Sequence, residues 1–344
     1  MKKFIRIGVD LGKRYIQIHA LESKDGRAVK RKLPRSKFLE FFADVAPCLI
    51  GMEACGSAHY WARQLRAMGH DVRLMPPAYV KAYVKRGKND AVDAAACCEG
   101  VSRPDMRFVP VKSEEQQATL TLHRTRELLV RQRTMCVNAL RGHLTEFGLV
   151  AAKGIGRAGE LIDMAGNDAE LPEIAKSVVK IFAEQLAAIQ ALIAALEKQI
   201  AGVHAQSPMS QLLLLAGIPG VGKIIASAIV ASVPDPQVFK SARDFAAWLG
   251  LVPRQNSTGG KTKLGPITKK GDRYLRKLLV LGATSALRVA GRRKGALRDW
   301  LAALLEKKKS ARLASVALAN KLARIIWAMM TSGETFRKDM YEPA

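Results

Sequence analysis

The chain has 344 residues, enough for two domains that each bury a hydrophobic core. Its hydrophobic content of 49% is that of a globular protein and excludes a chain that is disordered throughout. Lys and Arg number 56 against 30 Asp and Glu, a formal charge of +26, and residues 251–344 alone hold 21 basic and 6 acidic residues. The alternatives are a charge that serves only solubility and a basic surface that faces a membrane. Binding to a nucleic acid explains the charge better, because neutralised phosphates release counterions.

Cysteine usage and the N-terminus indicate a cytoplasmic protein. Without a C-x-x-C pair, the cysteines argue against zinc and against a disulfide framework, and they fit a reducing compartment. The chain passes directly into a strand-like segment, which speaks against a signal peptide. The most apolar stretch, 212–233, is interrupted by glycines, a proline and a lysine, so we expect no membrane span there. The five cysteines are Cys48, Cys55, Cys97, Cys98 and Cys136.

The first hundred residues predict an α/β domain. Apolar alternation and turn residues define strands and helices in the order of an RNase H-like fold. That order alone is shared in part by many α/β domains. The predicted strands are 4–10, 15–21, 28–33, 48–52 and 71–75, and the predicted helices are 36–45 and 57–68.

Residues 105–207 are predicted to form a helical linker. Residues 113–147 have a polar helical pattern, and a glycine-rich stretch follows over 148–172. The next segment has an apolar seam with alternating steps of three and four residues, which is typical of a coiled coil. An intramolecular antiparallel hairpin with 113–147 and a dimer interface are both compatible with it. The seam consists of Phe182, Leu186, Ile189, Ile193, Leu196, Ile200 and Val203.

Residues 208–344 are predicted to be mostly helical. Residues 217–223 match the nucleotide-binding pattern G-x-x-x-x-G-K, with 212–215 as its strand, but Ile224 replaces the Ser or Thr that would bind Mg²⁺. A helix-hairpin-helix fits the same residues better, since its turn and second helix can bind a DNA phosphate through backbone N–H groups. A plain turn between two helices is the alternative. The expected phosphate contacts in this turn are Gly220, Gly222 and Lys223.

Four carboxylates fall at the ends of predicted elements. Asp10 and Glu53 end two strands, and Asp90 and Asp93 share one face at the start of a helix. A lone acid in such a place is usually a helix cap or a solvated side chain. Four together in a basic protein predict a site for Mg²⁺, because a cation offsets their mutual repulsion and can polarise a phosphodiester.

A loop rich in glycine and lysine is predicted over 253–271. Ser257 lies in it among cations, and a serine can attack phosphorus once its hydroxyl is activated and the developing charge is neutralised. Taken alone, such a tract is more often only a loop. The cations expected to contact phosphates are Arg254, Lys261, Lys263, Lys269, Lys270 and Arg273.

Four motifs together resemble one known family. Ile7-Gly8-Val9-Asp10, Met52-Glu53-Ala54-Cys55-Gly56, Lys88-Asn89-Asp90-Ala91-Val92-Asp93 and Gly250-Leu251-Val252-Pro253-Arg254 with Ser257-Thr258-Gly259-Gly260-Lys261 are similar to motifs of the DEDD-type insertion-sequence transposases. These are related to pilin-gene invertases and are also called bridge recombinases. The resemblance covers nearly the whole chain, apart from 148–172.

The resemblance implies a RuvC-like domain over 1–104, a helical coiled-coil linker over 105–207 and a C-terminal transposase domain over 208–344. It implies that Asp10, Glu53, Asp90 and Asp93 form the DEDD tetrad and that Ser257 joins covalently to DNA. The implied partners are donor and target DNA, a structured noncoding guide RNA and further copies of the chain. Two other functions remain open: a RuvC-like endonuclease that activates water, and a non-enzymatic architectural DNA-binding protein.

Overall fold

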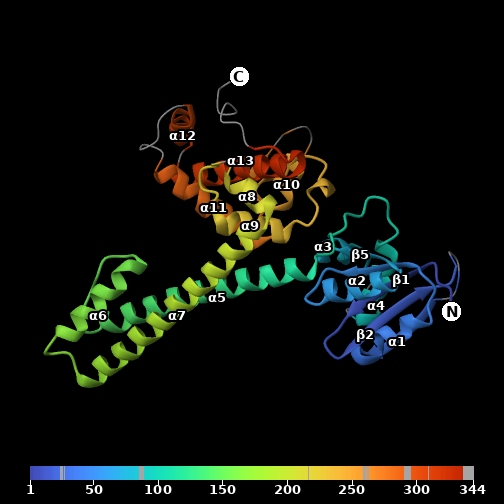
Figure 1. Cartoon of the computed structure of the whole chain (residues 1–344), viewed down its shortest axis with the longest axis horizontal. Helices are drawn as coiled ribbons and strands as arrows, with labels where there is room; N and C mark the ends of the chain where they lie inside the picture. Colours follow the sequence, from blue (N-terminus) through green and yellow to red (C-terminus); the bar gives the residue numbers. More distant parts are fainter. Residues whose placement is uncertain are drawn as a thin grey trace. The chain divides into compact units, whose positions relative to one another are not determined.

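The computed structural model describes residues 1–23, 26, 28–84, 89–215, 217–258, 261, 263–289, 296–308 and 310–335. The chain divides into two compact units (Figure 1): Met1–Glu114 with Val233–Val238, and Glu115–Ser232 with Phe239–Ala344. Lys88, Gly259 and Gly260 of the predicted motifs lie outside the described residues. The predicted domain boundaries after residues 104 and 207 stay a prediction.

The first unit is built on a five-stranded mixed sheet of order β3-β2-β1-β4-β5. The strands β1, β4 and β5 are parallel, while β2 is antiparallel to both of its neighbours. This sheet with its helices is compatible with the predicted RuvC-like domain. Its elements are β1 (Arg6–Leu11), β2 (Tyr15–Leu21), β3 (Ala28–Pro34), a 3-10 turn (Arg35–Lys37), α1 (Phe38–Ala43), β4 (Leu49–Glu53), α2 (Ala58–Ala67), β5 (Asp71–Met75), α3 (Pro77–Val80), a 3-10 turn (Lys81–Tyr83), α4 (Asp90–Gly100) and a 3-10 turn (Pro236–Val238).

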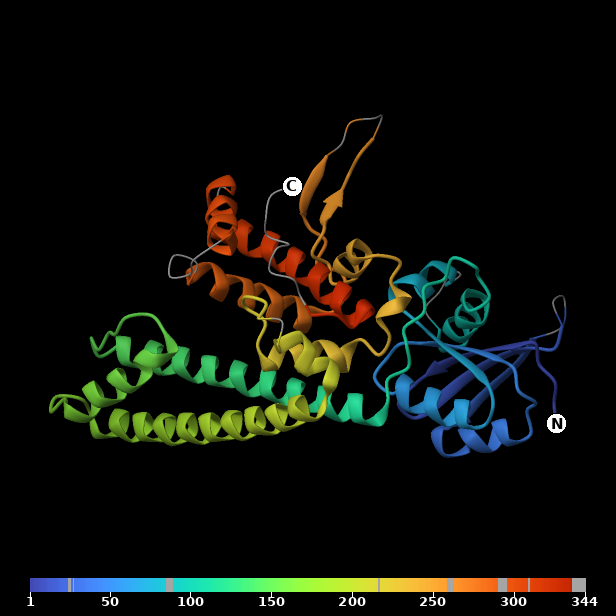
Figure 2. The ribbon, with the colours of Figure 1, turned by 45° about the horizontal axis from the view of Figure 1, so that its top comes forward.

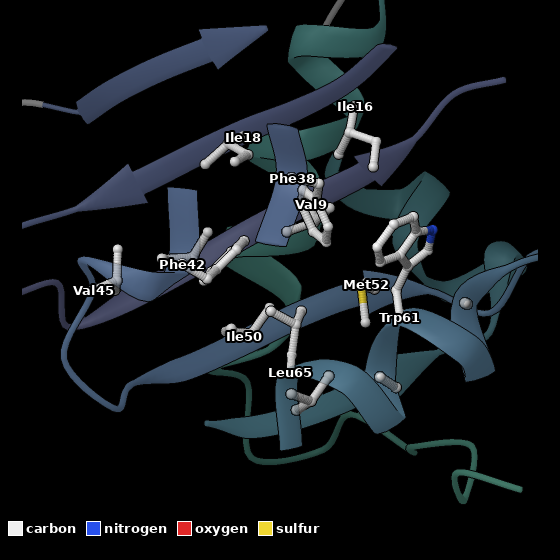
Figure 3. Close-up of a cluster of buried hydrophobic side chains, with 14 of the residues drawn as sticks. Val9, Ile16, Ile18, Phe38, Phe42, Val45, Ile50, Met52, Trp61 and Leu65 are labelled. Atoms are coloured by element: carbon white, nitrogen blue, oxygen red, sulfur yellow. The ribbon is translucent and has the colours of Figure 1, made fainter. Parts of the chain in front are cut away.

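One face of this sheet carries the hydrophobic core of the unit (Figure 3). Alternate residues of each strand point to that face, so Val9, Ile16 and Ile50 are buried against α1 and α2. The helices contribute aromatic side chains, among them Phe38 and Trp61, whose rings meet edge to face at 4.9 Å. The opposite face is covered in part by α4, where Cys97 and the C-cap residue Val101 pack with Met75 of β5 in a second buried cluster, and it also carries polar residues.

The second unit is mainly helical. Its elements are α5 (Glu114–Thr145), a 3-10 turn (Ile155–Arg157), α6 (Ala158–Asn167), α7 (Glu173–Gln206), α8 (Pro208–Leu215), α9 (Lys223–Ser232), α10 (Ala242–Trp248), β6 (Pro253–Gln255), β7 (Leu264–Ile267), α11 (Arg273–Arg288), α12 (Ala296–Lys307) and α13 (Ala311–Ser332). The helix α13 contacts both α10 and α11, and all three contribute buried apolar side chains. The predicted helical character from residue 208 onward is therefore confirmed.

The long helices α5 and α7 lie side by side and run in opposite directions (Figure 2). Arg126 of α5 donates to Glu197 of α7, and nearer the far end of the pair Cys136 donates to Gln185. The seven residues of the predicted seam are buried or half-buried, with Ile193 only 2% exposed. The chain thus forms the intramolecular hairpin. Coiled-coil packing and the dimer interface stay predictions.

Two segments differ from the sequence-based expectation. The stretch 148–172 contains the helix α6, whose Leu161 and Ala165 are fully buried between α5 and α7. The predicted loop over 253–271 contains an antiparallel hairpin made of β6 and β7. Neither element was predicted because glycines interrupt the apolar pattern of α6 and lie next to the short strands of the hairpin.

Two helices, α7 and α13, are long and apolar enough to span a membrane by length and composition alone. In the most apolar part of α13, 56% of the residues are buried inside the protein, as in a core helix, against 17% in α7. The stretch 212–233, considered first from the sequence, forms α8, a turn and α9.

Candidate active site

The first two carboxylates lie side by side at the carboxyl ends of adjacent parallel strands. In the register of β1 and β4, Val9 pairs with Met52, so Asp10 and Glu53 are the next residues along the two strands. Both side chains point to the face opposite the hydrophobic core, because Val9 and Met52 point into the core. The prediction that both acids lie at strand ends is confirmed, apart from Leu11, which extends β1 by one residue.

Two glycines bring α4 onto this face. Gly8 and Gly51 pair with each other, each two residues before a carboxylate, and so lie on the carboxylate face. A Cβ atom on Gly8 would lie 2.1 Å from the carbonyl oxygen of Ala94, and one on Gly51 would lie 2.7 Å from that of Cys97. No other residue type leaves room for α4 at this distance.

The amino end of α4 carries the other two carboxylates. Asn89 caps the helix by accepting a hydrogen bond from the Ala91 N–H at 3.0 Å, and Asp90 and Asp93 occupy the first turn. Acids are favourable there because the amino end of a helix carries partial positive charge. Since α4 crosses the strands at Gly8, its first turn extends toward their carboxyl ends.

Asp10 lies within electrostatic reach of the other three carboxylates. Burial, followed by the negative charges of Asp90, Asp93 and Glu53, raises the pKa of Asp10 to about 6. Burial and the charge of Asp93 also raise the pKa of Glu53. All four predicted tetrad residues therefore lie in one electrostatic cluster of the first unit.

The chemistry of this cluster fits a divalent cation. Its donors are carboxylate oxygens, the ligands that Mg²⁺ prefers, and a cation would offset the repulsion that, after burial, raises the two pKa values. Within the described residues, no three His, Cys, Asp or Glu side chains are close enough to share one metal ion. A bound cation would have to draw the carboxylates closer together than they are.

The predicted serine lies at the end of a hairpin in the second unit. Ser257 follows β6 and is exposed, and the Lys263 N–H donates to its Oγ at 3.3 Å. Figure 2 shows the hairpin projecting from the helices of its unit. The six cations predicted for this region are all exposed, and within the described part of the chain none of them forms an ion pair with a carboxylate.

The base of this hairpin is held by residues that were not predicted. Arg276 of α11 donates to the Leu249 carbonyl at 2.8 Å and to the Lys270 carbonyl at 3.1 Å, which joins the segments before and after the hairpin. Gly271, at φ +82°, lies so close to Trp248 that a Cβ would be 1.7 Å from its carbonyl oxygen. The lysine before these contacts, Lys269, has a φ of +56°, which is uncommon for a residue with a side chain.

The glycine turn between α8 and α9 divides into two parts. Gly220, at φ +83°, packs against α11, where a Cβ would lie 2.2 Å from the Gly282 carbonyl oxygen. Gly222 and Lys223 are exposed, and a Cβ on Gly222 would have open space. Where a nucleotide-binding loop needs a strand the chain forms α8, so the glycine turn joins two helices. Its use as a DNA-binding helix-hairpin-helix stays a prediction.

The sequence contained a signal for Gly8 and Gly51 that the motif analysis did not use. Both precede a carboxylate by two residues in an apolar strand, and a glycine inside a strand often marks close backbone approach. Arg276 carried no comparable signal, because an arginine in a basic amphipathic helix reads as a solvated side chain.

Two family models and several curated relatives match this chain. The model described as "Transposase IS116/IS110/IS902 family" matches residues 212–297, and a transposase model of the DEDD type matches residues 7–148. These ranges contain Ser257 and the four carboxylates, respectively.

Two of these relatives match nearly the whole chain. The "Probable family 20 transposase" of Pseudomonas aeruginosa is 47% identical over 96% of this chain and 98% of its own length. The "Transposase for insertion sequence element IS1328" of Yersinia enterocolitica is 38% identical over 96% of this chain and 98% of its own length. A shorter match, 29% identical over 38% of this chain and 39% of the relative, is to the pilin gene-inverting protein of Moraxella bovis. The chain therefore belongs to the IS116/IS110/IS902 family of transposases, enzymes of DNA transposition.

Proposed function

We propose that this transposase breaks and rejoins donor and target DNA through Ser257, assisted by Mg²⁺ at Asp10, Glu53, Asp90 and Asp93. The observation that carries the proposal is the position of Ser257, an exposed hydroxyl at the end of a hairpin. Arg254 and Lys263 flank it without carboxylate partners among the described residues.

The serine step conserves the energy of the broken bond. The Oγ–P bond forms as one P–O bond of the DNA strand breaks, the hydroxyl proton leaves, and the released strand oxygen takes up a proton. Because one phosphate ester replaces another, the reverse reaction rejoins DNA without ATP. Arg254, Lys261 and Lys263 would neutralise the charge that develops on the phosphate oxygens.

The carboxylates would hold the metal and position the phosphate. A bound Mg²⁺ supplies a positive charge that polarises the phosphodiester and offsets charge in the transition state. Asp10 and Glu53 are fixed by two strands, whereas Asp90 and Asp93 depend on the position of α4. The family implies the use of a divalent metal; the choice of Mg²⁺ follows from the all-oxygen donor set.

The partners proposed here follow from the charge and from the family. DNA is the substrate class of a transposase, and the formal charge of +26 favours binding to phosphates. Gly222 and Lys223 at the exposed start of α9, with Gly220 shaping the turn, would contact a DNA phosphate, as would Lys269, Lys270 and Arg273. A structured noncoding guide RNA and a homo-oligomer are proposed from the family resemblance, with the cytoplasm as the place of action.

A second candidate function is a RuvC-like endonuclease in which water, not serine, attacks the phosphate. The observation in its favour is that the whole carboxylate cluster lies within one unit and needs no residue from the other. That enzyme would leave free DNA ends. A purely architectural role conflicts with membership in a family of enzymes.

The test is a denaturing gel of the protein with labelled donor and target DNA, Mg²⁺ and guide RNA. Wild-type protein is expected to form a covalent adduct, and Ser257→Ala is expected to bind nucleic acid normally but to form neither adduct nor recombinant. Thr258→Ala is the matched control, since Thr258 is the exposed neighbour, and it should stay active. An adduct that persists in Ser257→Ala would move the nucleophile elsewhere.

Two further variants test the metal site that both candidate functions require. Asp10→Asn and Glu53→Gln should abolish strand cleavage by either mechanism and leave binding largely intact, because carboxylates do not bind phosphate directly. Wild-type cleavage in either variant would contradict the metal site. Cleavage by wild-type protein that yields only free ends, even with substrates that trap intermediates, would favour water as the nucleophile.

A further inference from the structure

The face of the sheet that carries Asp10 continues as a row of polar residues toward the edge strand β3. In the strand register Asp10 pairs with Gln17 of β2, and Gln17 pairs with Lys32 of β3. Paired residues of neighbouring strands point to the same face, so Glu53, Asp10, Gln17 and Lys32 cross four strands on one side of the sheet. Two strand spacings separate Asp10 from Lys32, which is about 10 Å.

The charge of this row changes sign along its length. Glu53 and Asp10 are acidic, Gln17 is neutral, and Lys32 is a cation joined on the same face by Lys30, which pairs with His19. Both lysines are exposed, and within the described residues neither forms an ion pair with a carboxylate.

The sequence around the row has the same bias. Segments 11–21 and 28–37 contain no Asp or Glu, and their basic residues are Lys13, Arg14, Lys30, Arg31, Lys32, Arg35 and Lys37.

An exposed aromatic ring completes this surface. Tyr15 lies on the same face as Gln17, two residues earlier in β2, and 49% of its surface is exposed. The Lys32 ammonium nitrogen lies 4.7 Å from the centre of the Tyr15 ring. An exposed ring beside a cation is the pair that proteins use to bind single-stranded nucleic acid, with the base or sugar on the ring and the phosphate at the cation.

A simpler explanation is that these lysines protect an edge strand. Lysines on an edge strand discourage pairing with another chain, and β3 is an edge strand. Edge protection, however, does not require the charges to share a face with the carboxylates, and it does not require an exposed tyrosine. Arg31 already places a charge on the opposite face of β3, where edge protection would serve equally well.

We propose that Lys30, Lys32 and Tyr15 bind the DNA strand whose scissile phosphate lies at the carboxylates, on the side that leads to β3. The inference rests on the proposed role of Asp10 and Glu53 and adds a binding surface to it. Successive phosphates of one DNA strand are farther apart through space than the rise of about 3.4 Å per nucleotide along the helix axis, so about 10 Å reaches a phosphate roughly two nucleotides from the reacting one. Gln17, between the two, faces the strand that connects them.

The first experiment measures binding without cleavage. Full-length protein carrying Asp10→Asn is titrated with labelled donor DNA over a range of salt concentrations, with and without Lys30→Gln and Lys32→Gln. The double substitution should weaken DNA binding. It should also make the negative slope of log K against log salt less steep by about two, because each phosphate contact contributes about −0.9 to that slope. Arg31→Gln, on the same strand but the opposite face, should leave the slope unchanged.

The second experiment locates the contact. Single phosphates of the cleaved strand are replaced in turn by uncharged methylphosphonates. One replacement, roughly two nucleotides from the cleavage position, should weaken DNA binding by the protein that keeps both lysines and have no further effect in the Lys32→Gln protein. Equal effects in both proteins at every position would overturn the proposal.

The remaining outcomes are also decisive. If the double substitution made the salt dependence less steep for labelled guide RNA but not for DNA, the surface would bind RNA and the proposal would be refuted. Self-association of the double variant with unchanged DNA binding would establish edge protection instead. Failure of the metal site would appear in the cleavage assay of Asp10→Asn, whereas failure of this surface appears only in the binding slope.

Discussion

Gly8→Ala tests whether the position of α4 governs catalysis. The new Cβ would lie 2.1 Å from the Ala94 carbonyl oxygen and 2.2 Å from the Cys98 backbone nitrogen. Both are backbone atoms, so no side chain can rotate away, and α4 must move by more than about 1 Å to reach ordinary contact. Overpacking of this kind costs about 1–3 kcal/mol of stability.

The same movement separates Asp90 and Asp93 from Asp10 and Glu53. A misplacement of about 1 Å can cost about 100-fold in rate, so Gly8→Ala should cut strand cleavage by roughly that factor. DNA binding should be unchanged, and the melting temperature should fall modestly. The assays are single-turnover cleavage, salt-dependent binding and thermal unfolding monitored by circular dichroism.

The matched control for this variant is Gly56→Ala. Gly56 lies in the same unit, and a Cβ there would meet no atom within 4 Å. It should therefore cleave DNA at the wild-type rate. Gly8→Ala protein with wild-type stability and wild-type cleavage would refute the argument, since α4 would then tolerate displacement without consequence for the carboxylates.

Two further predictions concern the second unit. Ile193→Asp should lower the free energy of unfolding of this unit by about 3 kcal/mol or more, because Ile193 is 2% exposed and an unpaired charge cannot be buried there. Leu192→Asp changes a position that is 54% exposed and should leave thermal unfolding of the monomer unchanged. If light scattering gives this variant a lower mass than the wild-type protein, α7 carries an oligomer interface. His123, buried between the Tyr274 and Ser227 hydroxyls, has its pKa lowered from 6.5 to about 4, chiefly by burial and then by Arg126. The unfolded chain therefore binds the proton more tightly, and about 3 kcal/mol of stability present above pH 6.5 should be lost as the pH falls to 4. Denaturant titrations of His123→Gln should show a smaller loss over that interval, and an identical pH profile would contradict the assignment.

The first unit could be predicted well because its pattern is local. Strand β2 alternates buried and half-buried or exposed residues, so the bounds 15–21 follow from period two alone, and 71–75 were likewise correct. The sequence also predicted that two carboxylates lie at strand ends, since an acidic residue directly after an apolar run marks the end of a buried strand. What could not be predicted was the parallel register that makes Asp10 and Glu53 neighbours, because pairing between distant segments leaves no local periodicity.

The second unit shows the opposite limit. Helix α7 was recognisable from its seam, but its partner was ambiguous, since an apolar stripe does not reveal whether another copy or the same chain covers it. The hairpin of β6 and β7 was missed because strands of three and four residues are too short to alternate visibly. Its anchor, Arg276, bonds two carbonyls that lie 27 and 6 residues away in sequence. Such a bond depends on the fold and not on any residue pattern.

Glycines mark the clearest boundary between what a sequence predicts and what only a fold decides. A glycine is required wherever something must approach the backbone, but the sequence does not say whether that is a ligand or another part of the chain. Gly220 approaches Gly282, and Gly8 approaches Ala94, so both are explained by backbone packing. Gly222 has open space where a Cβ would be, and its φ is not positive, which leaves its small size unexplained by the chain itself. Of the two turn glycines first assigned to phosphate binding, Gly222 is therefore the one whose lack of a side chain is consistent with a need for an outside partner.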